Sequence, residues 1–231
     1  GTIFDLNTGH AVNVDRKTRF DEPFNITDGY SDLAQLNAEY RLSDAWTARF
    51  DYSYSQDHYN DDQARVMAYD SATGNLTRRV DATHGSTQKM HSSRADLQGN
   101  VVIGGFYNEI LTGLAYENYD LLRTDMIRCK NVKGFNIYNP VYGTVGKCSS
   151  ASASDSDQRI QQESYAGYVQ DALYLTDKWI AVAGVRYQYY TQYAGKGRPF
   201  NVNTDSSDQK WTPKAGLVYK LTPSVSLFGN V

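Results

Sequence analysis

Polar and apolar residues alternate strictly between Thr47 and Ser55. The polar positions are Thr47, Arg49, Asp51, Ser53 and Ser55, and the positions between them are Ala48, Phe50, Tyr52 and Tyr54. Successive side chains of a β-strand point to opposite faces, so the segment predicts a strand with one polar and one apolar face. A strand of a membrane barrel has this pattern, and so does an antiparallel strand on a soluble core.

The same alternation recurs along the chain and predicts about eight strands. They are expected near residues 31–41, 47–55, 90–102, 109–122, 164–175, 179–193, 209–221 and 225–231. In the sixth of these, one face is expected to carry Trp179, Ala181, Ala183, Val185, Tyr187 and Tyr189. The face assignment of the fourth stays open. Most of these segments exceed the roughly 5–6 residues of strands in soluble proteins.

The predicted connections alternate in length. Short turns are expected at 42–46, 103–108, 176–178 and 222–224, with long polar loops at 56–86 and 123–161 and an intermediate one at 194–208. Outer-membrane barrels have short periplasmic turns and longer extracellular loops, and Trp46 and Trp179 stand where an interfacial aromatic girdle would fall. The pattern predicts an all-β, antiparallel transmembrane outer-membrane β-barrel, with a soluble β-sandwich as the alternative fold.

Composition narrows the possible functions. The chain of 231 residues carries a net charge of −3, which argues against a nucleic-acid partner, and it is rich in Tyr, with 19. Its mean hydropathy is −0.59, and no apolar run approaches the roughly 18 residues of a membrane helix. Strand-like runs near both ends would leave open sheet edges, which a bilayer does not tolerate. We therefore expect residues 1–231 to form one partial β-barrel domain of a larger barrel.

Motifs of the common enzyme classes are absent from the sequence. The histidines His10, His58, His84 and His91 form no HExxH, and there is neither a GxSxG elbow nor a Walker A motif. We expect neither an enzyme nor a metal site. A lipase-type Ser-His-Asn arrangement using His84 or His91 is the remaining enzymatic alternative.

The two cysteines, Cys129 and Cys148, lie in the same long polar segment. Their spacing makes no CxxC motif, and two Cys alone cannot complete a zinc site. A disulfide that closes a surface loop in an oxidising compartment is the favoured interpretation. Two unpaired buried thiols are the alternative, which the polar surroundings disfavour.

Several short elements, in order, resemble the barrel of TonB-dependent siderophore receptors. They are YRLSDAWTAR (40–49), YDSATGNLTRR (69–79), ILTGLAY (110–116), NIYNPV (136–141), GYVQD (167–171), GVRY (184–187) and WTPKAGL (211–217). The element NIYNPV is similar to a loop of ferric hydroxamate receptors of the ferrichrome and ferrioxamine type. The resemblance covers nearly the whole chain from Ser31.

The resemblance implies the middle part of a plugged barrel of about 22 strands, with the plug domain and remaining strands absent. It implies energy-coupled uptake of a ferric siderophore in the Gram-negative outer membrane, and the element NIYNPV implies that this siderophore is a hydroxamate. Iron would arrive already chelated, so no protein-bound cofactor is expected. Implied partners are the siderophore, outer-membrane lipids, TonB through the absent plug, and a phage or bacteriocin on the exposed loops. A passive porin or small adhesion-type barrel is the alternative function.

Aromatic side chains of the loops are the implied ligand contacts, because rings offer rigid apolar area and a hydroxyl for the oxygens of a chelate. The candidate ligand-binding residues are Tyr69, Phe135, Tyr138 and Tyr142, with Tyr138 foremost. Tyr138 could instead pack in its loop and anchor the Asn139–Pro140 turn, and Tyr69 could instead be an interfacial aromatic residue. The inward-facing charges Arg49, Asp51, Arg94, Asp96 and Arg186 are expected to pair with one another or with the plug, or to line a substrate path.

Overall fold

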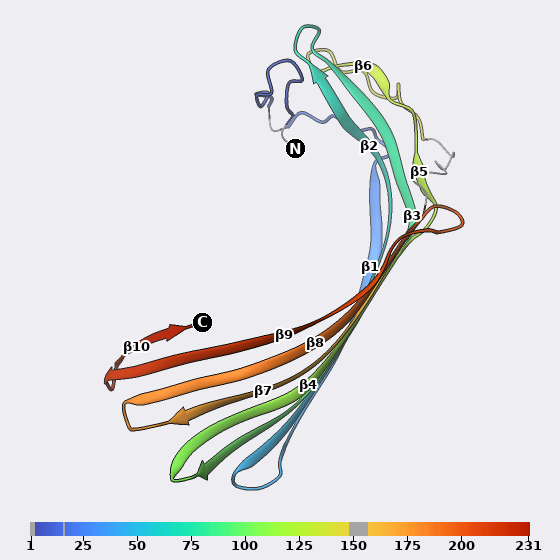
Figure 1. Cartoon of the computed structure of the whole chain (residues 1–231). Helices are drawn as coiled ribbons and strands as arrows, with labels where there is room; N and C mark the ends of the chain where they lie inside the picture. The colour runs from blue at the N-terminus through green and yellow to red at the C-terminus, as the bar shows by residue number, and fades with distance from the viewer. Residues whose placement is uncertain (1–2, 16, 148–156) are drawn as a thin grey trace.

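The computed structural model describes residues 3–15, 17–147 and 157–231. Its regular structure is one twisted, curved antiparallel sheet (Figure 1). The strands are β1 (Ile26–Arg41), β2 (Trp46–Asp70), β3 (Asn75–Ile103), β4 (Phe106–Arg123), β5 (Met126–Arg128), β6 (Val132–Asn136), β7 (Gln158–Tyr174), β8 (Trp179–Lys196), β9 (Asn201–Thr222) and β10 (Val225–Asn230). Within the described part of the chain, no helix is long and apolar enough to cross a membrane.

The strands follow one another across the sheet in the order β1-β2-β3-β4-β7-β8-β9-β10, while β5 and β6 pair with β3. Every strand on this path therefore lies beside the next one, as in an up-and-down barrel wall. The eight strands that the alternation predicts are all present. The two short strands β5 and β6 lie inside the predicted loop 123–161 and carry too few residues for a periodic signal.

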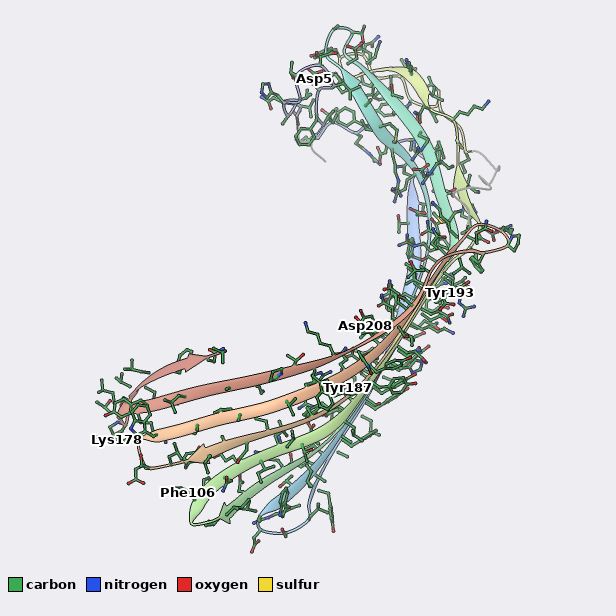
Figure 2. All side chains as sticks on the ribbon, in the orientation of Figure 1. Asp5, Phe106, Lys178, Tyr187, Tyr193 and Asp208 are labelled. Atoms are coloured by element: carbon green, nitrogen blue, oxygen red, sulfur yellow. The ribbon has the colours of Figure 1, made fainter. Side chains whose placement is uncertain are left out.

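Side chains project from both faces of the sheet (Figure 2), and the pairing register sorts them into rows. One row crosses six strands through Phe50, Ala95, Leu114, Gly167, Tyr187 and Trp211. The next row, on the opposite face, runs through Glu39, Arg49, Asp96, Gly113, Tyr168 and Arg186. We call these two sides the apolar face and the polar face. The predicted faces of β2 and β8 are confirmed. The faces of β4, which the sequence left open, follow from Leu114, because this residue lies in the row of the apolar face.

The short turns lie together at one end of the sheet, which we call the turn end. Within them, the amide N–H groups of Leu42 and Leu175 donate to the carbonyls of Trp46 and Trp179, over 2.9 and 3.0 Å. Both predicted girdle tryptophans therefore close a hairpin turn. The opposite end is the loop end, where the connections are longest (Figure 1).

The prediction of a polar loop at 56–86 is wrong. β2 and β3 pair from Trp46↔Gly99 up to Asp70↔Asn75, so the hairpin continues far beyond its neighbours. Residues 56–63 of β2 are mostly polar, which hides the strand from a hydropathy reading. The prediction of an intermediate loop at 194–208 is wrong in the same way, since β8 and β9 reach Lys196 and Asn201.

Other segments cover both edges of the projecting hairpin. β1 pairs with β2 only as far as Ile26↔Asp62, and beyond it the N-terminal segment takes over, with the amide of Leu6 donating to the carbonyl of Tyr69 over 3.1 Å. On the other edge, β4 stops opposite Ser86, and β5 and β6 pair with β3 instead. Covered edges keep the backbone groups of the hairpin satisfied and prevent edge-to-edge association.

Candidate functional site

The candidate site lies at the loop end, where the N-terminal segment and the segment after β4 close around the projecting hairpin. We call this assembly the loop-end unit: residues 3–15 and 17–25, the hairpin residues 57–86, and residues 126–147. It contains two small hydrophobic clusters. One is formed by Ile3, Tyr69, Leu76 and Phe135, and the other by Ala64, Val80 and Val145. Most of the fully buried apolar side chains among the described residues belong to this unit.

Two of the four predicted ligand contacts, Tyr69 and Phe135, are buried in the first cluster. The ring of Phe135 meets the rings of Phe20 and Tyr142 at centroid distances of 6.5 and 5.5 Å. A hydrogen bond with the Tyr138 side chain, together with burial, raises the pKa of Tyr69 to about 12. The residues Tyr69, Phe135, Tyr138 and Tyr142 form one aromatic group, and Tyr69 and Phe135 are its buried base. Contact of these two residues with a ligand stays a prediction.

The other two, Tyr138 and Tyr142, lie at the surface of the same group. Tyr138 is 79% exposed, and the Asn136 side chain holds its backbone by accepting from the Tyr138 amide over 2.9 Å. Its ring lies over Gly74, where an added Cβ would come within 2.8 Å of Tyr138 Cε2. The Tyr142 hydroxyl donates to the Arg19 carbonyl over 2.9 Å. The structure thus brings the four predicted residues together, with Tyr138 the most accessible.

A buried ion pair beneath these rings has no counterpart in the sequence prediction. Arg78 Nη2 lies 2.6 Å from Glu22 Oε1, and the two side chains are 1% and 0% exposed. Glu22 Oε2 accepts from the Gly143 amide over 2.7 Å, and the Arg78 guanidinium lies 3.9 Å from the centre of the Phe135 ring. The pair thus joins the N-terminal segment, the hairpin and the residues after β6.

A signal for this pair exists in the sequence. Residues 76–83 read Leu-Thr-Arg-Arg-Val-Asp-Ala-Thr, so Arg78 occupies an apolar position of an alternating strand. A charge at such a position must find a partner if the face is buried. Its partner Glu22 lies in an irregular segment, and no local pattern identifies it.

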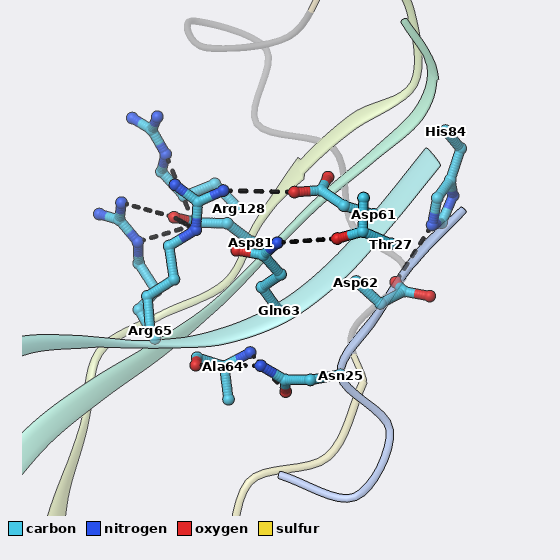
Figure 3. A network of polar contacts seen from close by, with 11 residues as sticks. Asn25, Thr27, Asp61, Asp62, Gln63, Ala64, Arg65, Asp81, His84 and Arg128 are labelled. Carbon is cyan, nitrogen blue, oxygen red and sulfur yellow. Dashed lines mark hydrogen bonds and ion pairs between the residues drawn. The ribbon is translucent and has the colours of Figure 1, made fainter. Parts of the chain in front are cut away.

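A cavity of about 800 Å³ opens between the N-terminal segment and β2. Its walls include the exposed apolar side chains Phe4, Leu6 and Met67. Arg19, Asp21 and Arg65 supply its charges. The cavity adjoins a network of charged side chains around Arg65 (Figure 3).

On the polar face of the sheet, three of the predicted inward charges form ion pairs. Arg49 Nε lies 2.7 Å from Glu39, and Arg94 Nε lies 2.6 Å from Asp96. The Tyr168 hydroxyl donates to Asp96 and accepts from Arg94. Gly113 permits this contact, because a Cβ there would meet the Asp96 carboxylate and the Tyr168 hydroxyl.

The remaining two predicted charges are also engaged. Asp51 accepts from Asn37 over 2.5 Å, and Arg186 Nε contacts Gln188 Oε1 at 3.4 Å. A second cavity, of about 380 Å³, lies against Arg94, Tyr168 and Arg186. Of the five predicted charges, Arg94 and Asp96 form an ion pair with each other, Arg49 pairs with Glu39, and Asp51 and Arg186 contact neutral amides. Pairing with a plug and a role in a substrate path stay predictions.

Cys129 is disulfide-bonded, and it packs against the second hydrophobic cluster. Its predicted partner Cys148 lies outside the described residues, so the pairing stays a prediction. No group of three or more His, Cys, Asp or Glu side chains suited to a metal ion occurs in the described ranges.

Comparison with known proteins gives the family. The family model described as "TonB dependent receptor-like, beta-barrel" matches residues 2–231. The metal-pseudopaline receptor CntO of Pseudomonas aeruginosa is 26% identical over 99% of this chain and 33% of its own length. An uncharacterized TonB-dependent receptor of Haemophilus influenzae is 30% identical over 42% of this chain and 29% of its own. The chain thus spans about a third of the length of these relatives.

Solved structures show the same fold at low identity. The ferric preacinetobactin receptor BauA of Acinetobacter baumannii has a TM-score of 0.76 and 20% identity, over 92% of this chain and 31% of that one. The ferripyoverdine receptor of Pseudomonas aeruginosa has a TM-score of 0.76 and 15% identity, over 99% and 30%. The chain therefore belongs to the TonB-dependent receptor-like β-barrels of the Gram-negative outer membrane.

Proposed function

We propose that the protein carrying this chain takes up a ferric siderophore or related metal chelate, using energy delivered through TonB. Family membership supports a transport receptor rather than an enzyme. The names of its relatives, receptors for metal-pseudopaline and ferric preacinetobactin, support a metal chelate as the cargo. The plug and the remaining barrel strands would belong to the same protein. Short turns would then face the periplasm and the loop-end unit the cell exterior.

The observation that carries the proposal is the aromatic group of the loop-end unit. Tyr138 presents an accessible ring and hydroxyl above a packed base formed by Tyr69 and Phe135. In a ferric siderophore the chelate already fills the coordination sites of the metal, so the receptor has to recognise the amphipathic surface of the chelate. An aromatic ring offers rigid apolar contact to that surface, and its hydroxyl can hydrogen-bond to the outer oxygens of the chelate. A rigid base matters because a preordered contact costs less entropy on binding.

For the chemical class of the chelate we propose a hydroxamate. The element Asn136–Val141 supports a hydroxamate, whereas relatives are named for preacinetobactin, catecholates and pyoverdine. A panel of ferric hydroxamates, catecholates and carboxylates, added to the native protein purified from outer membranes, separates these classes by tryptophan quenching. A protein that quenches with no ferric chelate would contradict the proposal.

We expect Tyr138→Ala to weaken binding of the preferred chelate by at least about 1 kcal/mol, or about five-fold in Kd. The Asn136 cap on the backbone does not depend on the ring, so the loop should keep its shape. Tyr40→Ala is the matched control, since Tyr40 is similarly exposed but lies at the turn end. Equal Kd values for Tyr138→Ala and the unsubstituted protein would remove Tyr138 from the site.

Conductance separates this proposal from the passive porin that the sequence also allows. A plugged receptor should stay closed in a planar bilayer, while a porin or small open barrel would leak without ligand. Use of the exposed loops by a bacteriocin is a further proposal. It is supported by a structural neighbour solved as a complex with pyocin S2.

A further inference from the structure

The large cavity beside β2 opens on the polar face of the sheet. The positions of Arg49 and Arg65 on β2 differ by an even number, and the irregularity between them comes from the extra residue Gly85 on β3. β2 therefore keeps its alternation, and Arg65 projects from the same face as Arg49. In the barrel this is the side that surrounds the central path. A ligand entering from the outside would pass the cavity before reaching the polar wall below.

The guanidinium of Arg65 stands out among the charges of this region. Arg19 is engaged by Asp21 through two hydrogen bonds of 2.9 and 2.6 Å. Arg79 similarly grips Asp81 with two of 2.8 and 2.9 Å. The contacts of Arg65 are longer: its Nε lies 3.9 Å from Asp81 Oδ2, and its Nη2 lies 3.3 Å from Asp61 Oδ2 (Figure 3).

Arg65 is thus positioned by two carboxylates without being enclosed by them. Its side chain is 50% exposed, whereas those of Asp61 and Asp81 are 7% and 14% exposed. An arginine carries five N–H donors in a planar fork, and a single hydrogen bond to Asp61 uses one of them. The two buried carboxylates hold the fork at the surface of the cavity, where its free edge meets solvent.

The cavity also offers apolar contact within reach of that fork. Phe4, Leu6 and Met67 line it with side chains that are 60%, 70% and 42% exposed. A volume of about 800 Å³ suits a ligand of several hundred daltons, since small-molecule sites span roughly 300–1,000 Å³. An apolar wall beside a guanidinium with free N–H donors selects a ligand with an apolar part and an anionic group.

We propose that Arg65 binds a carboxylate of the metal chelate in this cavity, while Phe4, Leu6 and Met67 contact its apolar portion. The planar fork of arginine matches the two oxygens of a carboxylate, which gives directional recognition. This inference rests on the proposed uptake of a metal chelate and names a chemical class for it: a chelate with a free carboxylate. A neutral chelate without one would gain nothing from Arg65.

The test compares Arg65→Gln with the unsubstituted native protein. The probes are ferric citrate, which carries carboxylates, and ferrichrome, a neutral ferric hydroxamate. Arg65→Gln should raise the Kd for ferric citrate at least ten-fold and leave that for ferrichrome within two-fold. Arg65→Lys keeps the charge but loses the planar fork, so its Kd for ferric citrate should lie between those of the unsubstituted protein and Arg65→Gln. Arg41→Gln, at the exposed turn end, is the control and should change neither. Unchanged ferric citrate binding, or an equal loss for both chelates, would overturn the inference.

Iron-free citrate separates this inference from the uptake proposal. Binding of citrate that is lost in Arg65→Gln and kept in Arg41→Gln would support the carboxylate site even if no ferric chelate is taken up. The opposite result is also possible: the protein takes up a ferric chelate, but Arg65→Gln binds citrate and ferric citrate as tightly as the unsubstituted protein. This result would overturn the carboxylate site and leave the uptake proposal standing. Retained heat-modifiable gel migration of each variant shows that the barrel has folded.

Discussion

The hairpin of β2 and β3 passes through two environments, and its two halves are built differently. A strand needs about 9–11 residues to cross a bilayer, so β2 crosses from Trp46 to about residue 56. In this lower half the apolar side chains, such as Phe50, remain exposed on the outside of the sheet, as does Leu114 on the neighbouring strand β4. In the upper half, Leu76 and Val80 are fully buried beneath other segments.

The difference shows what the surrounding solvent demands. In lipid an exposed apolar side chain costs nothing, and the sheet needs only a complete backbone ladder. In water the same alternation would expose an apolar stripe, so the N-terminal segment and residues 132–147 fold over it. The loop-end unit therefore has a small hydrophobic core of the kind found in water-soluble proteins, and it continues from the membrane-spanning part of the same strands.

Charges follow the same division. On the polar face Arg49 and Glu39 remain half exposed, so their pairing adds little. Arg78 and Glu22 lie in the soluble core, where an unpaired charge would be costly.

Removing Arg78 should have the largest effect. Arg78→Met leaves Glu22 buried without its partner, which costs about 3–5 kcal/mol and should unfold the loop-end unit locally. We expect faster hydrogen exchange at residues 76–82 and 132–145, with the membrane strands unchanged. Arg49→Met is the matched control in an exposed pair. Normal protection in Arg78→Met would mean that the two halves are not stabilised differently.

The double variant Arg78→Met/Glu22→Leu sharpens this prediction. Replacing both partners of a buried pair by apolar groups is often neutral. Protection should therefore return toward that of the unsubstituted protein. A double variant as unprotected as the single one would assign the loss to the hydrogen bonds that Arg78 donates to the Phe20 carbonyl and the Thr144 hydroxyl, which both variants lack, rather than to the unpaired charge.

Truncation of apolar side chains tests the second half of the comparison. Leu76→Ala removes a side chain that is 0% exposed and should destabilise the loop-end unit by about 2–5 kcal/mol. Leu114→Ala, at a side chain 68% exposed on the apolar face, should leave exchange in its own strand nearly unchanged. Exchange measured at β3 and β4 in both variants decides the matter. Equal losses would show that the lower half also relies on packing.

Acid should loosen the unit slightly through Asp62. Burial would raise the pKa of Asp62, but hydrogen bonds and charges from Lys147 and His84, at 2.9 and 3.1 Å, lower it below 3.8. The resulting stabilisation is complete above pH 3.8 and is lost as the pH falls through the lowered folded value.

We therefore expect protection at residues 143–147 to decline below about pH 4. Asp62→Asn should show the weaker protection already at pH 7 and a flatter response to acid. An identical acid response in Asp62→Asn and the unsubstituted protein would assign the change to other groups.

The sequence alone predicted the strands of the membrane wall and their faces. Alternation at Thr47–Ser55 and at Trp179–Tyr189 is sufficient, because it reflects the two-residue repeat of the backbone itself. Alternation failed along 56–86, where polar residues on both faces hide a strand whose partners come from elsewhere. It also grouped Tyr69, Phe135, Tyr138 and Tyr142 as loop residues, without separating buried from exposed rings.

What the sequence by itself determined is thus the fold class, the two faces of the sheet and the ends at which turns and loops gather. Only the tertiary structure decided that the upper hairpin carries a core, that Glu22 pairs with Arg78, and that Arg65 borders a cavity. The physical reason is the range of the forces involved. Strand periodicity is local, whereas burial of a charge or a ring depends on segments more than fifty residues away, as between Arg78 and Glu22.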